Sequence, residues 1–600
     1  MYKFSIHNKA PVIMNYNLNE LSAQQGKTST GKALGKLLRL ITEERRNLYL
    51  ALCAILTNSG LNLLGPFLIG YTIDKFISHG DYHSVLMYAG LLLLMYVVVF
   101  FAGYAQTTIM GGIGQRMLFK LRNSIFSKLQ ELPVGFFNQN KAGDLISRVN
   151  NDTDKINVFF SQSLMQFIGT IATMTGSGIF LLVINIKLGL AALVPGLLIF
   201  VFTRLTSGWV KKKNAVSLKS TGGLSAEIQE SLQNFKVIIA FNRRDYFRKR
   251  FDQSNQQNYK AAVGAGLANN IFLPVYGLFA SLAQLTVLLY GIHLISTGEF
   301  SVGLLIAYLS YATNFYNPLR QLAALWANFQ AAMAGWDRIS VILGLESNLV
   351  TLVAKPKVVK NTALLSFNNV HFGYVEDKEI LHNISFDFER GKTYALVGPT
   401  GGGKTTTASL IARLYDPVKG EVLLEGKDIR TYSPEERTGK IGFILQEPFL
   451  FTGTVRENIL YSNEQYKGYT NEQLEQVIKD ANLQTILAIF DKGLDTPIAS
   501  SGDTISLGQK QLIAFMRAVL RNPDLLILDE ATANIDTITE QILEEILNRL
   551  PETTTRVIIA HRLNTIQNAD EIYFVNAGEV VRAGSLDHAM NMLMHGKRAS

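Results

Sequence analysis

The chain has 600 residues, of which 48% are hydrophobic and 18% are charged, and its formal net charge is +9. This length is too great for one domain, and the composition is more apolar than that of a typical soluble protein. The basic residues are not interleaved with aromatic ones as on a nucleic-acid surface, so we expect no nucleic-acid partner. The single cysteine, Cys53, excludes an intrachain disulfide and a multi-cysteine metal site.

A polar cytoplasmic segment is expected at residues 1–46, and it shows no cleavable signal pattern. Within it, residues 31–46 carry leucines and an isoleucine at helical spacing among lysines and arginines. This pattern indicates an amphipathic, elbow-like helix on the cytoplasmic face of a membrane. The cytoplasmic start of the first membrane helix explains the same pattern equally well.

Residues 47–345 contain six long uncharged stretches in succession. A membrane-spanning helix needs about 20 largely apolar residues. One such stretch could form the core of a soluble domain, but six in succession predict an all-α transmembrane domain of six helices. The fourth stretch is marginal by this measure. The stretches are residues 48–73, 84–115, 156–186, 188–203, 261–298 and 300–319.

Lysines and arginines are concentrated in residues 10–47, 116–155 and 204–260, whereas the other loops between the stretches are very short. Because positive residues are enriched on the cytoplasmic side of membranes, these segments and both termini should face the cytoplasm. We therefore expect a multi-pass protein of the cytoplasmic (inner) membrane of the cell. This orientation also accounts for the net positive charge.

After an expected linker at residues 346–363, the pattern changes to the short strands and helices of an α/β domain at residues 364–600. An apolar run at 393–397 predicts a buried strand, and residues 406–414 predict a helix. The segment between them, 398–405, fits the phosphate-loop pattern G-x-x-x-x-G-K-[ST] at every fixed position. We predict a P-loop NTPase domain, with nucleotide contacts from Gly398, Pro399, Thr400, Gly401, Gly402, Gly403, Lys404, Thr405 and Thr406.

Several side chains of this domain are suited to phosphate chemistry. In such a loop the backbone N–H groups converge on the β-phosphate, Lys404 reaches the β/γ oxygens, and the Thr405 hydroxyl can ligate Mg²⁺. The apolar strand 525–529 ends in Asp529, which can hold the water shell of Mg²⁺, and Glu530 can polarise an attacking water. His561 follows another apolar run and could contact the γ-phosphate or orient Glu530, although by itself it resembles an ordinary polar residue at a strand end.

Further short motifs follow in a fixed order: Phe-Gly-Tyr at 372–374, Ile-Leu-Gln-Glu at 444–447, Ile-Ser-Leu-Gly-Gln at 505–509 and Ala-Asn-Ile-Asp at 533–536. With them, the chain from about residue 31 to about residue 594 resembles exporter-type half-transporters of the ATP-binding cassette family, similar to multidrug and lipid exporters. The resemblance implies ATP and Mg²⁺ as cofactors. It implies that Tyr374 stacks on adenine, that Gln446 contributes to catalysis and to the metal site, and that His561 is the switch histidine. The remaining nucleotide contacts that it implies are Ser506, Gly508, Gln509 and Asp536.

The membrane half also resembles the exporter branch of this family. Residues 132–137 and 143–148 resemble its first intracellular loop, and residues 227–251, including 237–241, resemble its second. In the family such loops carry short coupling helices that dock on the nucleotide domains. Amphipathic helices lying on the membrane are the alternative, but cytoplasmic excursions of about 40 and 60 residues favour projecting rods.

Three residues depart from the family pattern. Leu507 stands where the signature motif has its first glycine, Ser500 stands where a glutamate is usual, and Asn534 stands where a small residue is frequent. None of these changes removes a catalytic side chain. Leu507 could nevertheless limit how closely the backbone approaches a γ-phosphate, because glycine is the residue that permits such an approach.

The sequence thus predicts ATP-driven export of an amphipathic or hydrophobic solute (a drug, lipid or peptide) by alternating access in a dimer. The complete set of motifs favours a homodimer over a heterodimer. Import on the same fold and an ATP-gated channel or regulatory ATPase are the alternatives. Intramembrane charges are nearly absent, which suits an amphipathic solute. Candidate lining residues, each of which helix packing would also explain, are Phe159, Phe160, Tyr276, Phe279, Tyr308, Tyr311, Asn58, Asn62, Asn269, Asn270 and Asn314.

Overall fold

The computed structural model describes residues 15–24, 35, 44–349, 351–352, 363–375, 378–499, 505–529, 536–559 and 566–595. The chain divides into two compact units. The helical unit comprises residues 22–129 and 143–343, and the α/β unit comprises residues 1–21, 130–142 and 344–600. Segments 1–21 and 130–142 therefore belong with the C-terminal part of the chain, although they precede or interrupt the helical unit in sequence.

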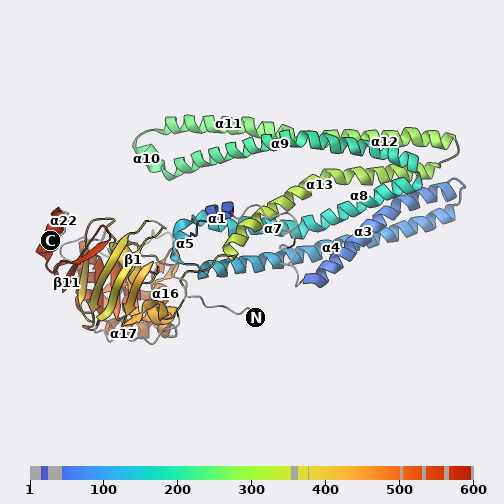
Figure 1. The fold of residues 1–600 in the computed structure, drawn as a ribbon. Helices are drawn as coiled ribbons and strands as arrows, with labels where there is room; N and C mark the ends of the chain where they lie inside the picture. Colours follow the sequence, from blue (N-terminus) through green and yellow to red (C-terminus); the bar gives the residue numbers. More distant parts are fainter. Residues whose placement is uncertain are drawn as a thin grey trace. The chain divides into compact units, whose positions relative to one another are not determined.

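The helical unit consists of long helices, and Figure 1 shows α9 and α11 lying side by side and joined through the short α10. Its elements are α3 (Arg45–Thr72), η2 (Ile73–Ile77), α4 (Tyr82–Glu131), α6 (Ala142–Ser147), η3 (Arg148–Asp152), α7 (Thr153–Val158), η4 (Phe159–Ser163), α8 (Leu164–Ile184), α9 (Ile186–Gln233), α10 (Phe235–Ala240), α11 (Arg244–Asn270), α12 (Phe272–Ser296) and α13 (Val302–Leu343).

Five helical segments within the described residues are long and apolar enough to cross a membrane: Arg45–Ile77, Tyr82–Glu131, Ala142–Ile184, Ile186–Gln233 and Arg244–Ser296. They contain the first, second and fourth predicted stretches and all but the last two residues of the third and fifth. The sixth stretch begins α13, which is helical throughout but does not reach the same hydropathy. Tyrosines and asparagines such as Tyr308, Tyr311 and Asn314 make this stretch more polar.

Most of the aromatic side chains that we considered as a solute lining instead pack the helices together. The hydroxyls of Tyr308 and Tyr311, both 0% exposed, donate to the carbonyls of Leu181 and Leu63 at 2.5 and 2.7 Å. These bonds attach α13 to α8 and α3. The side chains of Phe159, Phe160 and Tyr276 are also buried. Packing, rather than solute lining, therefore describes these five residues in this structure.

The α/β unit contains two main sheets. Its helices are α1 (Leu18–Gln24, whose last residues fall in the helical unit), α5 (Val134–Gln139), α14 (Lys404–Ile411), α15 (Pro434–Lys440), α16 (Val455–Leu460), α17 (Asn471–Asp480), α18 (Gln484–Leu487), α19 (Leu507–Val519), α20 (Thr537–Asn548) and α22 (Leu586–His595). Its strands are β1 (Ala363–Phe372), β2 (Leu381–Glu389), β3 (Thr393–Val397), β4 (Lys419–Leu424), β5 (Lys427–Asp428), β6 (Ile441–Ile444), β7 (Gly453–Thr454), β8 (Pro497–Ile498), β9 (Leu525–Asp529), β10 (Thr555–Ile559), β11 (Glu571–Asn576) and β12 (Glu579–Arg582).

The larger sheet has the order β12-β11-β3-β10-β9-β6, and only β12 runs antiparallel to its neighbour. The second sheet, β2-β1-β4-β5, is antiparallel. Alternate residues of β9 enter two different cores: Leu525 and Ile527 pack in one, and Leu526 and Leu528 pack in the other. A parallel strand that is covered on both faces is apolar throughout, which is why these strands could be predicted from continuous apolar runs.

Candidate nucleotide-binding site

The phosphate loop lies at the carboxyl edge of the larger sheet. Parallel pairing aligns Leu396 of β3 with Ile559 of β10, and Ile559 with Asp529 of β9. The carboxyl ends of these three strands therefore lie at one edge of the sheet, which is where open α/β sheets bind their ligands. β6 pairs with β9 in the same direction, and Gln446 follows it by two residues and is exposed.

Two glycines shape the loop. Gly403 precedes α14 with a φ of +117°, which is a left-handed conformation, and a Cβ on Gly402 would lie 2.5 Å from the carbonyl oxygen of Val575. The N–H of Gly578, in the β11–β12 turn, donates to the carbonyl of Gly402 at 3.1 Å. The loop is thus pressed against β11, and only glycine fits at both positions without strain. Pro399, Thr400, Gly401 and Thr405 are exposed, and Gly398, Gly402, Gly403, Lys404 and Thr406 are buried.

Lys404 is the first residue of α14 and is only 5% exposed. Its ammonium group donates to the carbonyl oxygens of Gly398 and Pro399 at 2.8 and 3.0 Å. The positive charge of Lys404 therefore lies inside the phosphate loop. It is also at the N-terminus of a helix, a place where anions are stabilised. A triphosphate would replace these neutral acceptors with charged oxygens, which form stronger hydrogen bonds.

The residues near α14 fit a magnesium ion. The Thr405 hydroxyl donates to Asp529 Oδ1 at 3.3 Å, so a hydroxyl and a carboxylate oxygen lie together beside the loop. Mg²⁺ usually takes one or two protein oxygens together with substrate phosphates and water. No group of three His, Cys, Asp or Glu side chains in the described part of the chain could hold a metal by itself. The site therefore suits an ion that arrives with a phosphate ligand.

Tyr374 lies beside the helix that follows the loop. Its hydroxyl is 3.2 Å from the Thr406 hydroxyl, and its ring lies 5.0 Å from those of Phe372 and Tyr415, centroid to centroid. A half-buried aromatic ring at this position can offer a face to a nucleobase. The stacking on adenine that the family resemblance implies for Tyr374 stays a prediction.

The helix after the loop is shorter at its C-terminal end than predicted. We expected residues 406–414, whereas α14 runs from Lys404 to Ile411. Arg413 adopts a left-handed conformation with a φ of +52°, and it forms an ion pair with Asp416 at 3.0 Å in which both side chains are buried. This pair replaces the last helical turn.

The signature segment begins a helix. Ser506 caps α19: its hydroxyl accepts from the N–H of Gln509 at 3.1 Å, and the Gln509 side chain accepts from the N–H of Ser506 at 2.8 Å. This reciprocal capping box explains both residue types by local structure alone. Leu507 is the first helical residue and is 40% exposed, so it does not prevent the helix from forming.

Gly508 and Asp536 lie together, which the sequence did not indicate. A Cβ on Gly508 would lie 2.8 Å from Thr539 Oγ1 and 3.1 Å from Asp536 Oδ2. Asp536 caps α20 by accepting from the N–H and the hydroxyl of Thr539 at 2.9 and 2.7 Å. These hydrogen bonds hold the pKa of Asp536 below its ordinary value. Four further predicted positions, Glu530, His561, Ser500 and Asn534, lie outside the described residues, as does most of the predicted helix at residues 31–46.

Comparison with known proteins agrees with this geometry. Residues 48–319 match the family model of the ABC transporter transmembrane region, and residues 381–533 match the ABC transporter model. The chain is 33% identical to an uncharacterized ABC transporter ATP-binding protein of Bacillus subtilis over 93% of its own length and 92% of that protein. It belongs to the ABC transporter family.

Two further relatives have names that describe a transported class. A fatty acid ABC transporter ATP-binding/permease protein of Mycobacterium tuberculosis is 31% identical over 84% of this chain and 79% of its own length. A multidrug resistance ABC transporter ATP-binding and permease protein of Lactococcus lactis is 33% identical over 79% of this chain and 80% of its own length. The present transporter is therefore a membrane protein that binds ATP and hydrolyses it.

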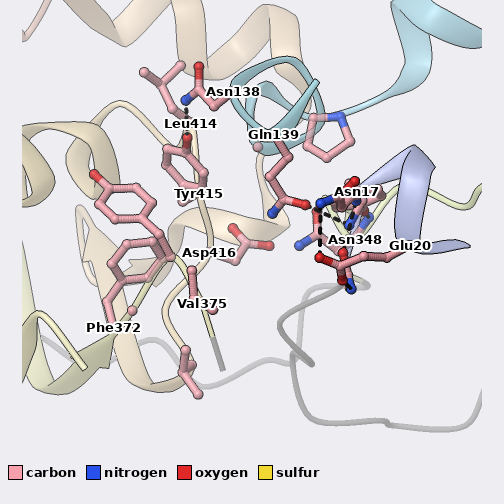
Figure 2. Close-up of a pocket in the computed structure, with 17 residues that line it drawn as sticks. Asn17, Glu20, Asn138, Gln139, Asn348, Phe372, Val375, Leu414, Tyr415 and Asp416 are labelled. Atoms are coloured by element: carbon pink, nitrogen blue, oxygen red, sulfur yellow. Dashed lines mark hydrogen bonds between the residues drawn. The ribbon is translucent and has the colours of Figure 1, made fainter. Parts of the chain in front are cut away.

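In this transporter the helix α5, within the predicted first intracellular loop, is part of the α/β unit. Phe136 of α5 is fully buried, and the Asn138 amide donates to the Tyr415 hydroxyl at 2.7 Å (Figure 2). α5, Tyr374 and Tyr415 line a cavity of about 710 Å³. Sequence reasoning selected residues 132–137 but missed Asn138 and Tyr415. The only signal for Tyr415 is its place in a turn just before Pro417.

Proposed function

We propose that the transporter uses ATP to export an amphipathic or hydrophobic solute across the cytoplasmic membrane, as a dimer that alternates between inward and outward access. The observation that carries the proposal is the phosphate loop with its buried Lys404, in the same chain as five apolar helical segments, among the described residues, that are long enough to span a membrane. To drive such a cycle, ATP must bind the closed dimer more tightly than the open one.

The proposed roles of the site residues follow from their chemistry. Lys404 binds the β/γ-phosphates, and Tyr374 stacks on the adenine. Thr405, Asp529 and Gln446 would hold Mg²⁺, which neutralises phosphate charge when bound. Glu530 is proposed to polarise the attacking water, and His561 to orient that carboxylate or contact the γ-phosphate. Ser506, Gly508, Gln509 and Asp536 would contact the nucleotide held by the other cassette of the dimer.

Exposed apolar surface supports a dimer. At the tip of the α9–α11 hairpin, in and next to α10, Phe235, Val237 and Phe241 are 54%, 54% and 74% exposed. In the α/β unit, Phe449 and Tyr461 are 60% and 62% exposed. Clustered exposed apolar side chains mark interaction sites. A second copy of the chain would supply a complementary surface for each of these two patches.

A homodimer is the simpler assembly. Each chain carries one phosphate loop and one signature segment, and a composite ATP site needs a loop from one cassette and a signature from another. Two identical chains would form two such sites, and closed symmetric dimers are the commonest oligomers. The basic segments between the apolar helices support a cytoplasmic location for the termini and the cassette.

The proposed substrate class rests on the character of the apolar helices. Charged solutes usually require paired intramembrane charges, and the predicted spans carry almost none. The names of the two relatives, one for fatty acids and one for multidrug resistance, point to the same class. The buried aromatic residues do not support this substrate class, because they pack against neighbouring helices.

Transport by vesicles tests the function. In inverted membrane vesicles, ATP should drive uptake of a fluorescent amphipathic dye, which corresponds to export from the cell. Accumulation of the solute inside intact cells would indicate import instead, and ATP hydrolysis without movement of any amphipathic solute would favour a channel or regulatory ATPase. Co-purification of two differently tagged copies tests the homodimer, and ATPase activity that appears only with a second polypeptide would contradict it.

A further inference from the structure

The N-terminal strap, which we define as residues 15–21, belongs to the α/β unit although it precedes the first membrane helix. Tyr16 and Leu18 are only 3% and 1% exposed. Such deep burial shows that the strap packs closely against the rest of the α/β unit.

Tyr16 contacts two other segments of the unit. Its ring packs edge-on against Phe136 of α5, with centroids 6.3 Å apart and an interplanar angle of 88°. Its hydroxyl donates to the carbonyl of Glu346 at 3.1 Å and accepts from the N–H of Asn348 at 3.1 Å. One side chain thus joins α5 to the segment that follows α13.

Polar side chains at the end of α5 hold the backbone of the strap. The N–H of Tyr16 donates to the Gln139 side chain at 2.8 Å, and the N–H of Leu18 donates to the Asn140 side chain at 3.1 Å. The Asn140 amide donates to the carbonyls of Tyr16 and Phe136, each at 2.8 Å. Asn140 therefore binds the strap and the end of α5 together. Figure 2 shows Gln139 and Asn348 beside the strap residues Asn17 and Glu20.

These contacts involve every place where the chain passes between the two units. The chain crosses after residue 21, on both sides of 130–142, and before residue 344. The strap, α5 and residues 346–348 are the α/β-unit segments at these crossings, and Tyr16, in the strap, contacts both of the others. Any movement that the cassette transmits to the helical unit through the chain must pass through one of these segments.

We propose that Tyr16 is a positioning residue of the transport cycle, which clamps α5 to residues 346–348 so that the strap, α5 and residues 346–348 move together. The proposal rests on the proposed function, because it assumes that ATP acts on the membrane helices partly through α5. The proposal gives the N-terminal strap a role in the transport cycle. Binding of the nucleotide alone does not require the strap.

The clamp predicts reciprocal effects between α5 and residues 346–348. Tyr16→Phe keeps the ring on Phe136 and removes the two hydroxyl hydrogen bonds, and Asn140→Asp removes the two amide donors on the α5 side. We propose to measure backbone hydrogen exchange of both variants as full-length protein in lipid nanodiscs, with and without a non-hydrolysable ATP analogue. Each lost hydrogen bond shifts a local equilibrium roughly two- to tenfold. Tyr16→Phe should raise exchange in α5, and Asn140→Asp should raise exchange at 346–348, each by about tenfold.

Controls separate the clamp from a local structural role. Asn19→Ala changes an exposed residue of the same strap and should leave exchange in both segments as in the wild type. Protection of residues 398–405 by the analogue should persist in all three variants. The clamp would be overturned if Tyr16→Phe raised hydrogen exchange at Asn348 alone and Asn140→Asp raised it in α5 alone. If the analogue protects 398–405 but does not change α5 in the wild type, the proposed coupling through α5 is wrong, whereas reciprocal effects would still support the clamp.

Discussion

Asn138 of α5 donates a hydrogen bond to the Tyr415 hydroxyl at 2.7 Å. The ring of Tyr415 also packs against Tyr374, with centroids 5.0 Å apart and an interplanar angle of 80°. Burial raises the pKa of Tyr415 above its ordinary value, so the hydroxyl stays protonated and neutral at physiological pH. One tyrosine therefore connects α5 with the aromatic residue that we expect to stack on adenine.

The first prediction separates the two contacts of Tyr415. Tyr415→Phe removes the hydrogen bond to Asn138 and keeps the ring, so the KM for ATP should stay within about twofold of wild type while substrate stimulation of ATPase falls. Tyr415→Ala also removes the ring support of Tyr374 and should raise the KM for ATP roughly two- to tenfold. Steady-state ATPase assays measure both effects, with Tyr469→Phe, at another exposed tyrosine of the α/β unit, as control. Equal KM values for the two variants would contradict the proposed support of Tyr374.

The second prediction concerns Lys404. Lys404→Ala removes the buried ammonium group, and charge-assisted hydrogen bonds contribute about 1.5–3 kcal/mol, so ATP affinity should fall roughly ten- to a hundredfold. Lys392→Ala is a matched control at the opposite end of β3, where the lysine, whose side chain is 38% exposed, makes ion pairs with Glu389 and Glu571. It should change affinity little. Equilibrium binding of a fluorescent ATP analogue measures both, and similar losses in the two variants would argue against a specific role for Lys404.

The phosphate loop and its sheet could be predicted from the sequence because their signals are local. Both faces of β3 and β9 are covered, so each reads as a short continuous apolar run, and the predicted bounds 393–397 and 525–529 agree with the structure. The end of α14 could not be predicted, because a buried ion pair between Arg413 and Asp416 replaces its last turn.

Contacts between distant segments were beyond sequence reasoning. Asn138 and Tyr415 are separated by 277 positions, and Tyr16 and Asn348 by 332. No periodicity or motif reports such pairs. For the aromatic residues of the apolar helices, the sequence predicted a contact that the structure does not support. Tyr308 and Tyr311 are residue types that could line a solute pathway, but their hydroxyls donate to backbone carbonyls of neighbouring helices. Residue type alone does not distinguish the two roles.

The third prediction uses the contact between Gly508 and α20. An alanine in a helix usually stabilises by about 1 kcal/mol relative to glycine. In Gly508→Ala, however, the new Cβ would lie 2.8 Å from Thr539 Oγ1, so we expect a net loss of about 1–3 kcal/mol of stability. Gly439→Ala, in α15, meets nothing within 4 Å and should be neutral or stabilising. Thermal unfolding of the purified protein compares the two variants, and a stabilised Gly508→Ala would show that α19 and α20 separate readily.

The fourth prediction tests the proposed chemistry of Glu530. Glu530→Gln keeps the size of the side chain, but an amide cannot accept the proton of an attacking water. ATP should remain bound after gel filtration while phosphate release falls by about a hundredfold or more, which is the usual contribution of a general base. Undiminished phosphate release would remove Glu530 from this role.

The fifth prediction addresses the exposed tip of the α9–α11 hairpin. Phe241, which follows α10, is 74% exposed, and we propose that it contacts the cassette of a second copy. Phe241→Glu would place a charge in that apolar contact, where desolvation without a partner is costly. ATP binding should stay within about twofold of wild type, because the nucleotide affinity of the α/β unit does not depend on this contact. ATP-driven solute uptake into inverted vesicles should be lost.

Val581→Glu, at an exposed apolar residue of β12, is the control and should preserve uptake. Normal uptake by Phe241→Glu would exclude the tip from coupling, and loss of both uptake and ATP binding, with normal expression, would indicate misfolding rather than uncoupling.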